Sequence, residues 1–131
     1  MVVLGKSAPT WGLDISLANE TPKPLTLYQH SLPWAGYYST LLVAVKLDPA
    51  GTIIERNTPV DDPTSGSVTI QPAQVLTGEI SLQRHFPEFA EALAERDVIV
   101  FWSYQMKPVD GDQLPRLAGH VLFAKTQPTA L

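Results

Sequence analysis

The chain contains no cysteine. This absence excludes disulfide bonds, thiolate zinc sites and cysteine nucleophiles. Charged residues are also scarce, at 17% of the 131 residues, against a usual share of about 25%. A chain that stays unfolded because of its charge is therefore excluded. The net charge is -4 and no basic run offsets it, which disfavours binding to nucleic acid or to anionic membrane surfaces.

Long hydrophobic runs are missing as well. The longest apolar stretches, 41–45 and 98–102, are far shorter than the roughly 20 residues that span a bilayer. We therefore expect a soluble protein without membrane insertion. Residues 1–11 hold no apolar run of signal-peptide length, which favours a cytoplasmic location. A signal peptide removed from a precursor is the alternative.

The twelve prolines and eight glycines are spread along the chain, a distribution that suits many short strands. Alternating apolar residues and turn signals predict eight strands, at 12–19, 25–30, 40–47, 52–56, 67–71, 78–83, 98–105 and 117–125. Helical periodicity is limited to 87–96, and 126–131 is expected to be a loose tail. The length suits one domain with a single core.

This pattern predicts an all-β fold, an antiparallel immunoglobulin-like β-sandwich of about eight strands. One short helix precedes the penultimate strand. Two segments add a resemblance to this expectation: LANETPKPLTLYQHSLPW at 17–34 and IQPAQVLTGEISLQRHF at 70–86. The first resembles the second-strand region of immunoglobulin-like domains that accompany deuterolysin-type (peptidyl-Lys) metallopeptidases. The second is similar to the segment of that family in which a proline-led turn precedes a strand.

The resemblance implies an accessory or interaction module. In those proteins catalysis belongs to a separate zinc domain with a His-Glu-x-x-His motif, and this chain has no such motif. Its three histidines, His30, His85 and His120, are too far apart in sequence for helical or hairpin zinc-ligand spacing. Asp110 and Asp112 lack the other ligands of a calcium loop and suit a turn. We expect no metal, no cofactor and no enzymatic activity.

Residues 31–38 form an unusual loop with three aromatic side chains. If the strands alternate in direction, loops 31–38, 57–66 and 84–97 gather at one end of the sandwich. The candidate binding residues are then Trp34, Tyr37, Tyr38, Asp61, Asp62 and His85. Tyrosine and tryptophan are typical of binding hot spots. The alternative is that Trp34 plugs the end of the core.

These residues favour a non-catalytic protein-binding module of unidentified partner. Two alternatives stay open. A peptidase inhibitor would present a protruding loop, for which 57–66 is the best candidate, and a carbohydrate-binding module would stack sugars on exposed aromatic rings.

The strand at 98–105 is apolar on both faces, although a strand in a two-layer sandwich needs only one buried face. Helix 87–96, loop 31–38 or a second copy of the chain must cover the other. We expect a homodimer whose interface includes Ile99 and Phe101, with Trp102 and Tyr104 as the fallback pair.

Overall fold

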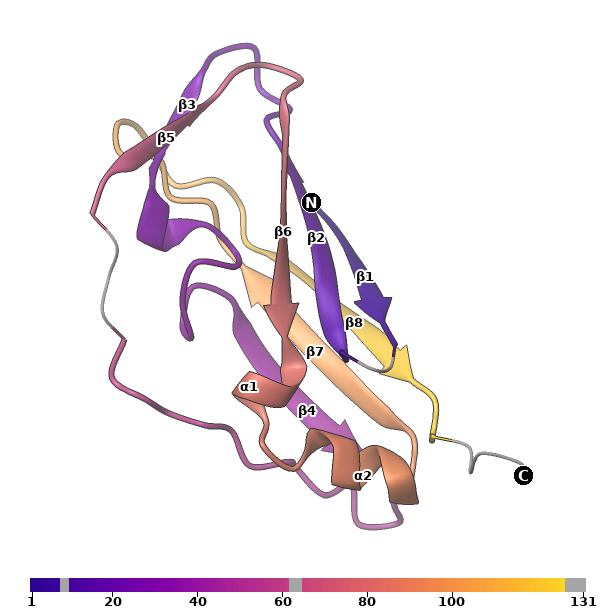
Figure 1. The fold of residues 1–131 in the computed structure, drawn as a ribbon. Coiled ribbons are helices and arrows are strands. Elements are labelled where there is room, and N and C mark those ends of the chain that lie inside the picture. The colour runs from indigo at the N-terminus through magenta and orange to yellow at the C-terminus, as the bar shows by residue number, and fades with distance from the viewer. Residues whose placement is uncertain (8–9, 62–64, 127–131) are drawn as a thin grey trace.

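A computed structural model describes residues 1–7, 10–61 and 65–126. The regular structure of this part of the chain is mostly strand, with three short helices (Figure 1). The strands are β1 (Val2–Lys6), β2 (Gly12–Ala18), β3 (Leu25–Tyr28), β4 (Leu41–Lys46), β5 (Ser67–Ile70), β6 (Val75–Ser81), β7 (Val98–Tyr104) and β8 (Leu117–Phe123). The helices are the 3-10 turn η1 (Gln29–Ser31), α1 (Leu82–His85) and α2 (Phe89–Glu95).

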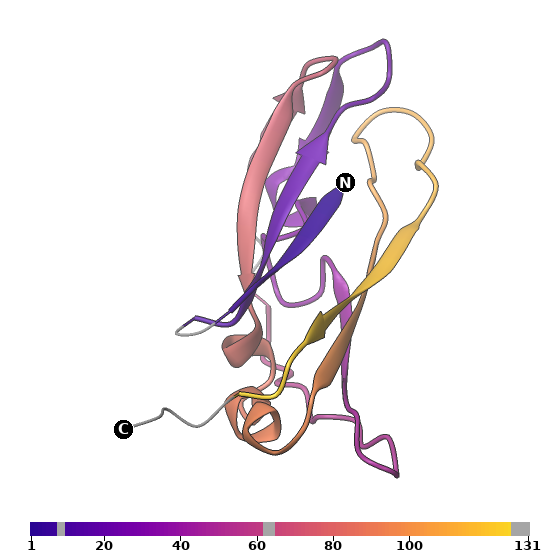
Figure 2. The same cartoon turned by 90° about the vertical axis from the view of Figure 1, so that its right-hand side faces the viewer.

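The strands pair in three antiparallel sheets with the orders β1-β2-β6, β4-β7-β8 and β3-β5. Figure 2 views the two three-stranded sheets edge-on, with α1 and α2 at one end of the space between them. The prediction of an all-β protein built from antiparallel strands is confirmed. None of the helices in the described segments is long and apolar enough to cross a membrane.

Alternating side chains from both three-stranded sheets form the main core. The buried residues are Leu13, Ile15, Ile80, Leu42, Ala44, Val98, Val100 and Phe123 from the strands, Ile54 from the segment after β4, and Leu82, Phe86, Phe89, Ala92 and Leu93 from the helical segment. The period of two places every second strand residue on the inner face. The α1 and α2 side chains then close the end of the core.

A second buried cluster lies where β3 and β5 meet the main sheets, and consists of Leu17, Leu27, Ile70, Tyr104 and Met106. Asn19 supports it, because its Nδ2 donates to the carbonyl oxygens of Lys23 and Ile70, both at 2.8 Å. A buried amide needs such partners to offset its lost hydration.

A tryptophan and a glycine face each other across β7 and β8. Trp102 pairs with Gly119, and a Cβ at position 119 would lie 2.7 Å from Trp102 Cζ2. Only glycine therefore leaves room for this indole ring.

Some sequence-based boundaries were wrong. The predicted strand at 52–56 is absent. After the turn at 48–51 the chain pairs with β4 at one position only, the isolated bridge between Ile53 and Val45. Strand β1 was not predicted, since its short sequence includes Gly5. The predicted strand 78–83 begins earlier, at Val75, and Leu82 and Gln83 belong to α1. The helix predicted at 87–96 spans Phe89–Glu95, because Pro87 and Glu88 precede its first turn.

The predicted tail falls almost wholly outside the described residues, at 127–131. Its first residue, Thr126, donates its backbone N–H to Leu93 O at 2.8 Å.

Replacing Tyr104 by phenylalanine tests the second cluster. Tyr104 is 1% exposed and its hydroxyl donates to Ser31 O at 2.6 Å. Because Tyr104→Phe leaves that carbonyl without its partner, we expect a loss of about 1–2 kcal/mol in the free energy of unfolding, measured with urea. Tyr28→Phe, at an exposed tyrosine, should change it little. Equal stabilities of Tyr104→Phe and the parent would contradict this role.

Candidate functional site

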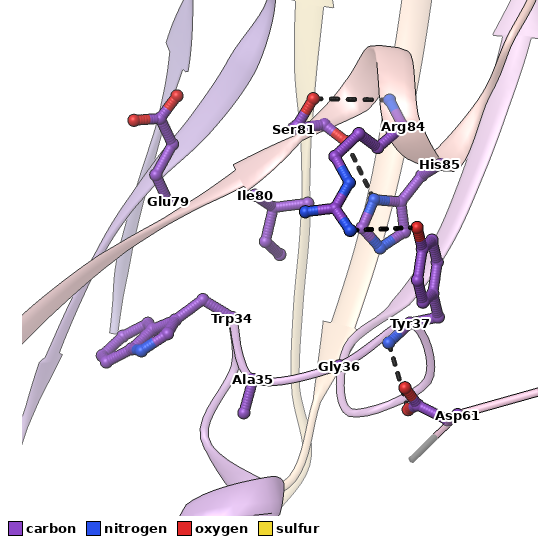
Figure 3. A pocket seen from close by; sticks show the side chains of 10 residues that line it. All are labelled: Trp34, Ala35, Gly36, Tyr37, Asp61, Glu79, Ile80, Ser81, Arg84 and His85. Atoms are coloured by element: carbon purple, nitrogen blue, oxygen red, sulfur yellow. Dashed lines mark hydrogen bonds between the residues drawn. The ribbon is translucent and has the colours of Figure 1, made fainter. Parts of the chain in front are cut away.

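A small cavity opens where the loop before β4 meets the end of β6 and α1 (Figure 3). Its volume is about 210 Å³, smaller than the roughly 300 Å³ at which pockets for drug-sized ligands begin. The lining residues are Trp34, Ala35, Gly36, Tyr37, Asp61, Glu79, Ile80, Ser81, Arg84 and His85. The space suits one or two side chains of a partner.

Trp34 anchors one side of this cavity. Its indole lies directly against Gly78 of β6, where a Cβ would sit 2.0 Å from Trp34 Cδ2. The same ring packs against both buried clusters. Trp34 therefore joins the two parts of the core, as the core-plug alternative expects.

Tyr37 lies at the other side, among polar groups from two other segments (Figure 3). Its backbone N–H donates to Asp61 Oδ2 at 3.2 Å. Its ring centroid is 4.9 Å from that of His85, and its hydroxyl accepts a hydrogen bond from Arg84 Nη2 at 3.3 Å. Two loops and the end of α1, far apart in sequence, thus meet at one tyrosine.

Tyr38 ties the same loop to the segment before Asp61. Its hydroxyl donates to Pro59 O at 2.6 Å, and the guanidinium carbon of Arg56 lies 5.4 Å from its ring centroid. The guanidinium carbon of Arg84 likewise lies 5.7 Å from the ring centroid of Tyr37. Each tyrosine therefore carries one arginine within cation–π distance.

The short helix α1 sets the positions of Arg84 and His85. Ser81 caps it, because its Oγ accepts a hydrogen bond from the Arg84 N–H at 3.3 Å. His85 Nδ1 lies 2.8 Å from Ser81 O, and since a carbonyl oxygen only accepts, Nδ1 carries the hydrogen. The His85 carbonyl in turn accepts from the Asn57 N–H at 2.8 Å.

Two arginines at this end of the molecule have no ionic partner in the described segments: Arg84 lines the cavity together with the carboxylates Asp61 and Glu79, whereas Arg56 lies outside its lining. In the described segments the ion pairs are Lys6–Glu79 at 3.2 Å and Lys46–Glu95 at 2.9 Å, so neither Arg56 nor Arg84 is in one. Nε and Nη2 of Arg56 are buried with no hydrogen-bond partner there. Burial lowers the pKa of Arg56. Burial also lowers the pKa of His85, and the positive charges of Arg56 and Arg84 lower it further. The hydrogen bond to Ser81 O acts in the opposite direction.

The predicted binding residues Trp34, Tyr37, Tyr38, Asp61 and His85 are thus brought together, and Asp62 lies outside the described residues. Sequence reasoning missed Arg56 and Arg84. Their positions in the sequence could have indicated them, because Arg56 and Arg84 each lie beside a loop that strands of alternating direction bring to the same end of the molecule as Tyr37. Among the described residues no group of three His, Asp or Glu side chains is placed to hold a metal ion.

The predicted interface residues lie on both faces of β7. Ile99 and Phe101 point outward, and Phe101 is 44% exposed. Trp102 packs against the main core and Tyr104 is buried, so the fallback pair faces inward.

Comparison with known proteins gave no match to a family model, to a curated protein or to a solved structure.

A pH dependence follows from the lowered pKa of His85. The unfolded chain, with a histidine pKa near its usual value of about 6.5, takes up a proton that folded His85 resists. Stability should therefore be full above about pH 6.5 and fall as the pH drops toward the folded pKa, by at most about 1.4 kcal/mol per pH unit.

The measurement is urea unfolding of the parent and of His85→Gln between about pH 7.5 and 5.5. His85→Gln should lose part of this pH dependence, whereas His30→Gln, at an exposed histidine, should keep it. Parallel pH profiles for the parent and His85→Gln would contradict the assignment.

Proposed function

We propose that this chain is a non-catalytic protein-binding module that holds a carboxylate of its partner at the cavity beside Tyr37. The observation that carries the proposal is the guanidinium group of Arg84, which lines the cavity, lies over the Tyr37 ring and is in no ion pair within the described residues. A peptide with an acidic side chain is the ligand that this chemistry fits.

Arginine is suited to this role because its planar group donates two parallel hydrogen bonds to a carboxylate. Arg84 is held in place before binding, by its stacking on Tyr37 and by its position in capped α1. A fixed side chain loses less conformational entropy on binding than a free one. Tyrosine and arginine are also the residue types that dominate binding energy in protein interfaces.

The proposal includes the immunoglobulin-like sandwich, supported by two facing antiparallel sheets that share one core. It also includes the accessory role implied by the resemblance to domains that accompany deuterolysin-type metallopeptidases, and the cytoplasmic location that the sequence favours. A fold of this kind serves many unrelated functions, so the binding role rests on the site.

Arg84→Gln tests the carboxylate site. Panning a random peptide library against the parent should enrich peptides that carry aspartate, glutamate or a free carboxyl terminus. Affinity of an enriched peptide, measured by calorimetry, should fall about 10-fold or more in Arg84→Gln, because a hydrogen bond to a charged group is lost.

Arg96→Gln is the matched control, since it removes the same charge from an exposed arginine beyond α2. Its affinity should stay close to that of the parent. Enrichment without acidic residues, or an equal loss in both variants, would overturn the carboxylate site.

One observation favours the peptidase-inhibitor alternative. The Val60 side chain is 97% exposed, although both of its neighbours are held, Pro59 by Tyr38 and Asp61 by Tyr37. A rigid loop that presents one aliphatic side chain can enter a peptidase pocket at low entropic cost. The carbohydrate alternative is less favoured, because Trp34 and Tyr37 lie against Gly78 and His85.

The inhibitor alternative predicts that the chain slows an elastase-type serine peptidase that cleaves after valine. Val60→Asp should abolish this inhibition, because a charged side chain does not fit an apolar specificity pocket. Val75→Asp, at a half-exposed valine of β6, should inhibit as the parent does. Unchanged hydrolysis of a chromogenic substrate in the presence of the parent chain would exclude this alternative.

A further inference from the structure

The outer face of β4, β7 and β8 is apolar and uncovered. Strand register aligns its side chains in rows that run across the sheet: Ile53, Val45, Ile99 and Leu122 in one row, and Val43, Phe101 and His120 in the next. Leu122, Phe101 and Val43 are 57%, 44% and 45% exposed. The face turns away from β1-β2-β6 (Figure 2), and nothing in the described part of the chain covers it.

This face also lacks formal charge, although the chain as a whole carries -4. Lys46 is the one formally charged residue in the three strands, and it belongs to the inward-facing row with Val98, where it pairs with Glu95. Arg116 reaches only the end of the face, where its Nη1 donates to Ser103 Oγ at 3.0 Å. An apolar centre with a polar rim is the usual composition of a protein interface.

We propose that a second copy of the chain covers this face in a closed dimer. The β4-β7-β8 sheets of the two copies then face each other, and the twofold axis passes between them near Phe101. In such a dimer each patch meets itself, so any central charge would face its own like charge. The apolar rows avoid that repulsion. They allow two chains of equal negative charge to approach, whereas this face offers nothing to attract a charged partner.

The size of the face is that of a weak interface. Strand spacings of about 4.8 Å and residue spacings of about 3.4 Å give a patch of roughly 20 Å by 20 Å, side chains included. Two such patches bury on the order of 1,000 Å², near the lower limit for a specific interface. Interfaces at this end of the range are typical of weak, transient complexes. We therefore expect a dissociation constant in the micromolar range and a monomer at high dilution.

Sedimentation equilibrium from about 1 to 300 μM, a range that brackets this constant, is the test. The mass of the parent should rise from 14.3 kDa toward twice that value. Phe101→Asp should weaken the dimer about 100-fold or more, because two carboxylates then meet near the axis in an apolar interface. Val43→Asp should also weaken the dimer. It replaces Phe101→Asp in this test if circular dichroism shows that Phe101→Asp does not fold.

Leu4→Asp is the matched control. Leu4 is 62% exposed on the outer face of the other sheet, so the same change should leave dimerisation as it is in the parent. A mass of 14.3 kDa at every concentration would overturn the dimer. Equal dimerisation of all the folded variants would overturn this face as the interface, and masses beyond a dimer would overturn its closed symmetry.

Discussion

The contact between Trp34 and Gly78 holds the arrangement together. A strand residue without a side chain lets the indole lie flat against the backbone of β6, in contact with both buried clusters. Interiors at crystal-like density leave no room for a methyl group there. The loop that carries Trp34 is consequently fixed at one point, and the residues that follow have little freedom in where they emerge.

That fixed point places Tyr37 and Tyr38 over segments from two other parts of the chain. Asp61 and Pro59 accept hydrogen bonds from the loop, and Arg84 donates to it. The contacts are polar and lie at the surface, where single hydrogen bonds contribute little net stability. Their effect is mainly on geometry, because they hold two cationic side chains against aromatic rings before any partner arrives. A preformed surface of this kind is typical of recognition.

Period-two alternation was enough to predict most strands and the convergence of three loops, because it reports which side chains face a core. It failed at 52–56, where one bridge replaces a strand, and at β1, whose short sequence does not alternate clearly. The pocket was less predictable. The only signal for Arg56 and Arg84 was their place at the edges of converging loops, because a single sequence does not show which arginines lie over tyrosine rings without an ionic partner.

The Trp102–Gly119 pair has a consequence for the alignment of β7 and β8. Because β7 is apolar on both sides, hydrophobic pattern alone would tolerate a slip by one residue, which turns every side chain to the opposite face. A slip would bring Ala118 or His120 opposite Trp102 and drive a Cβ into the indole ring. The missing side chain at Gly119 thus fixes the register that keeps Trp102 on the inner face of the sheet and Phe101 on the outer face.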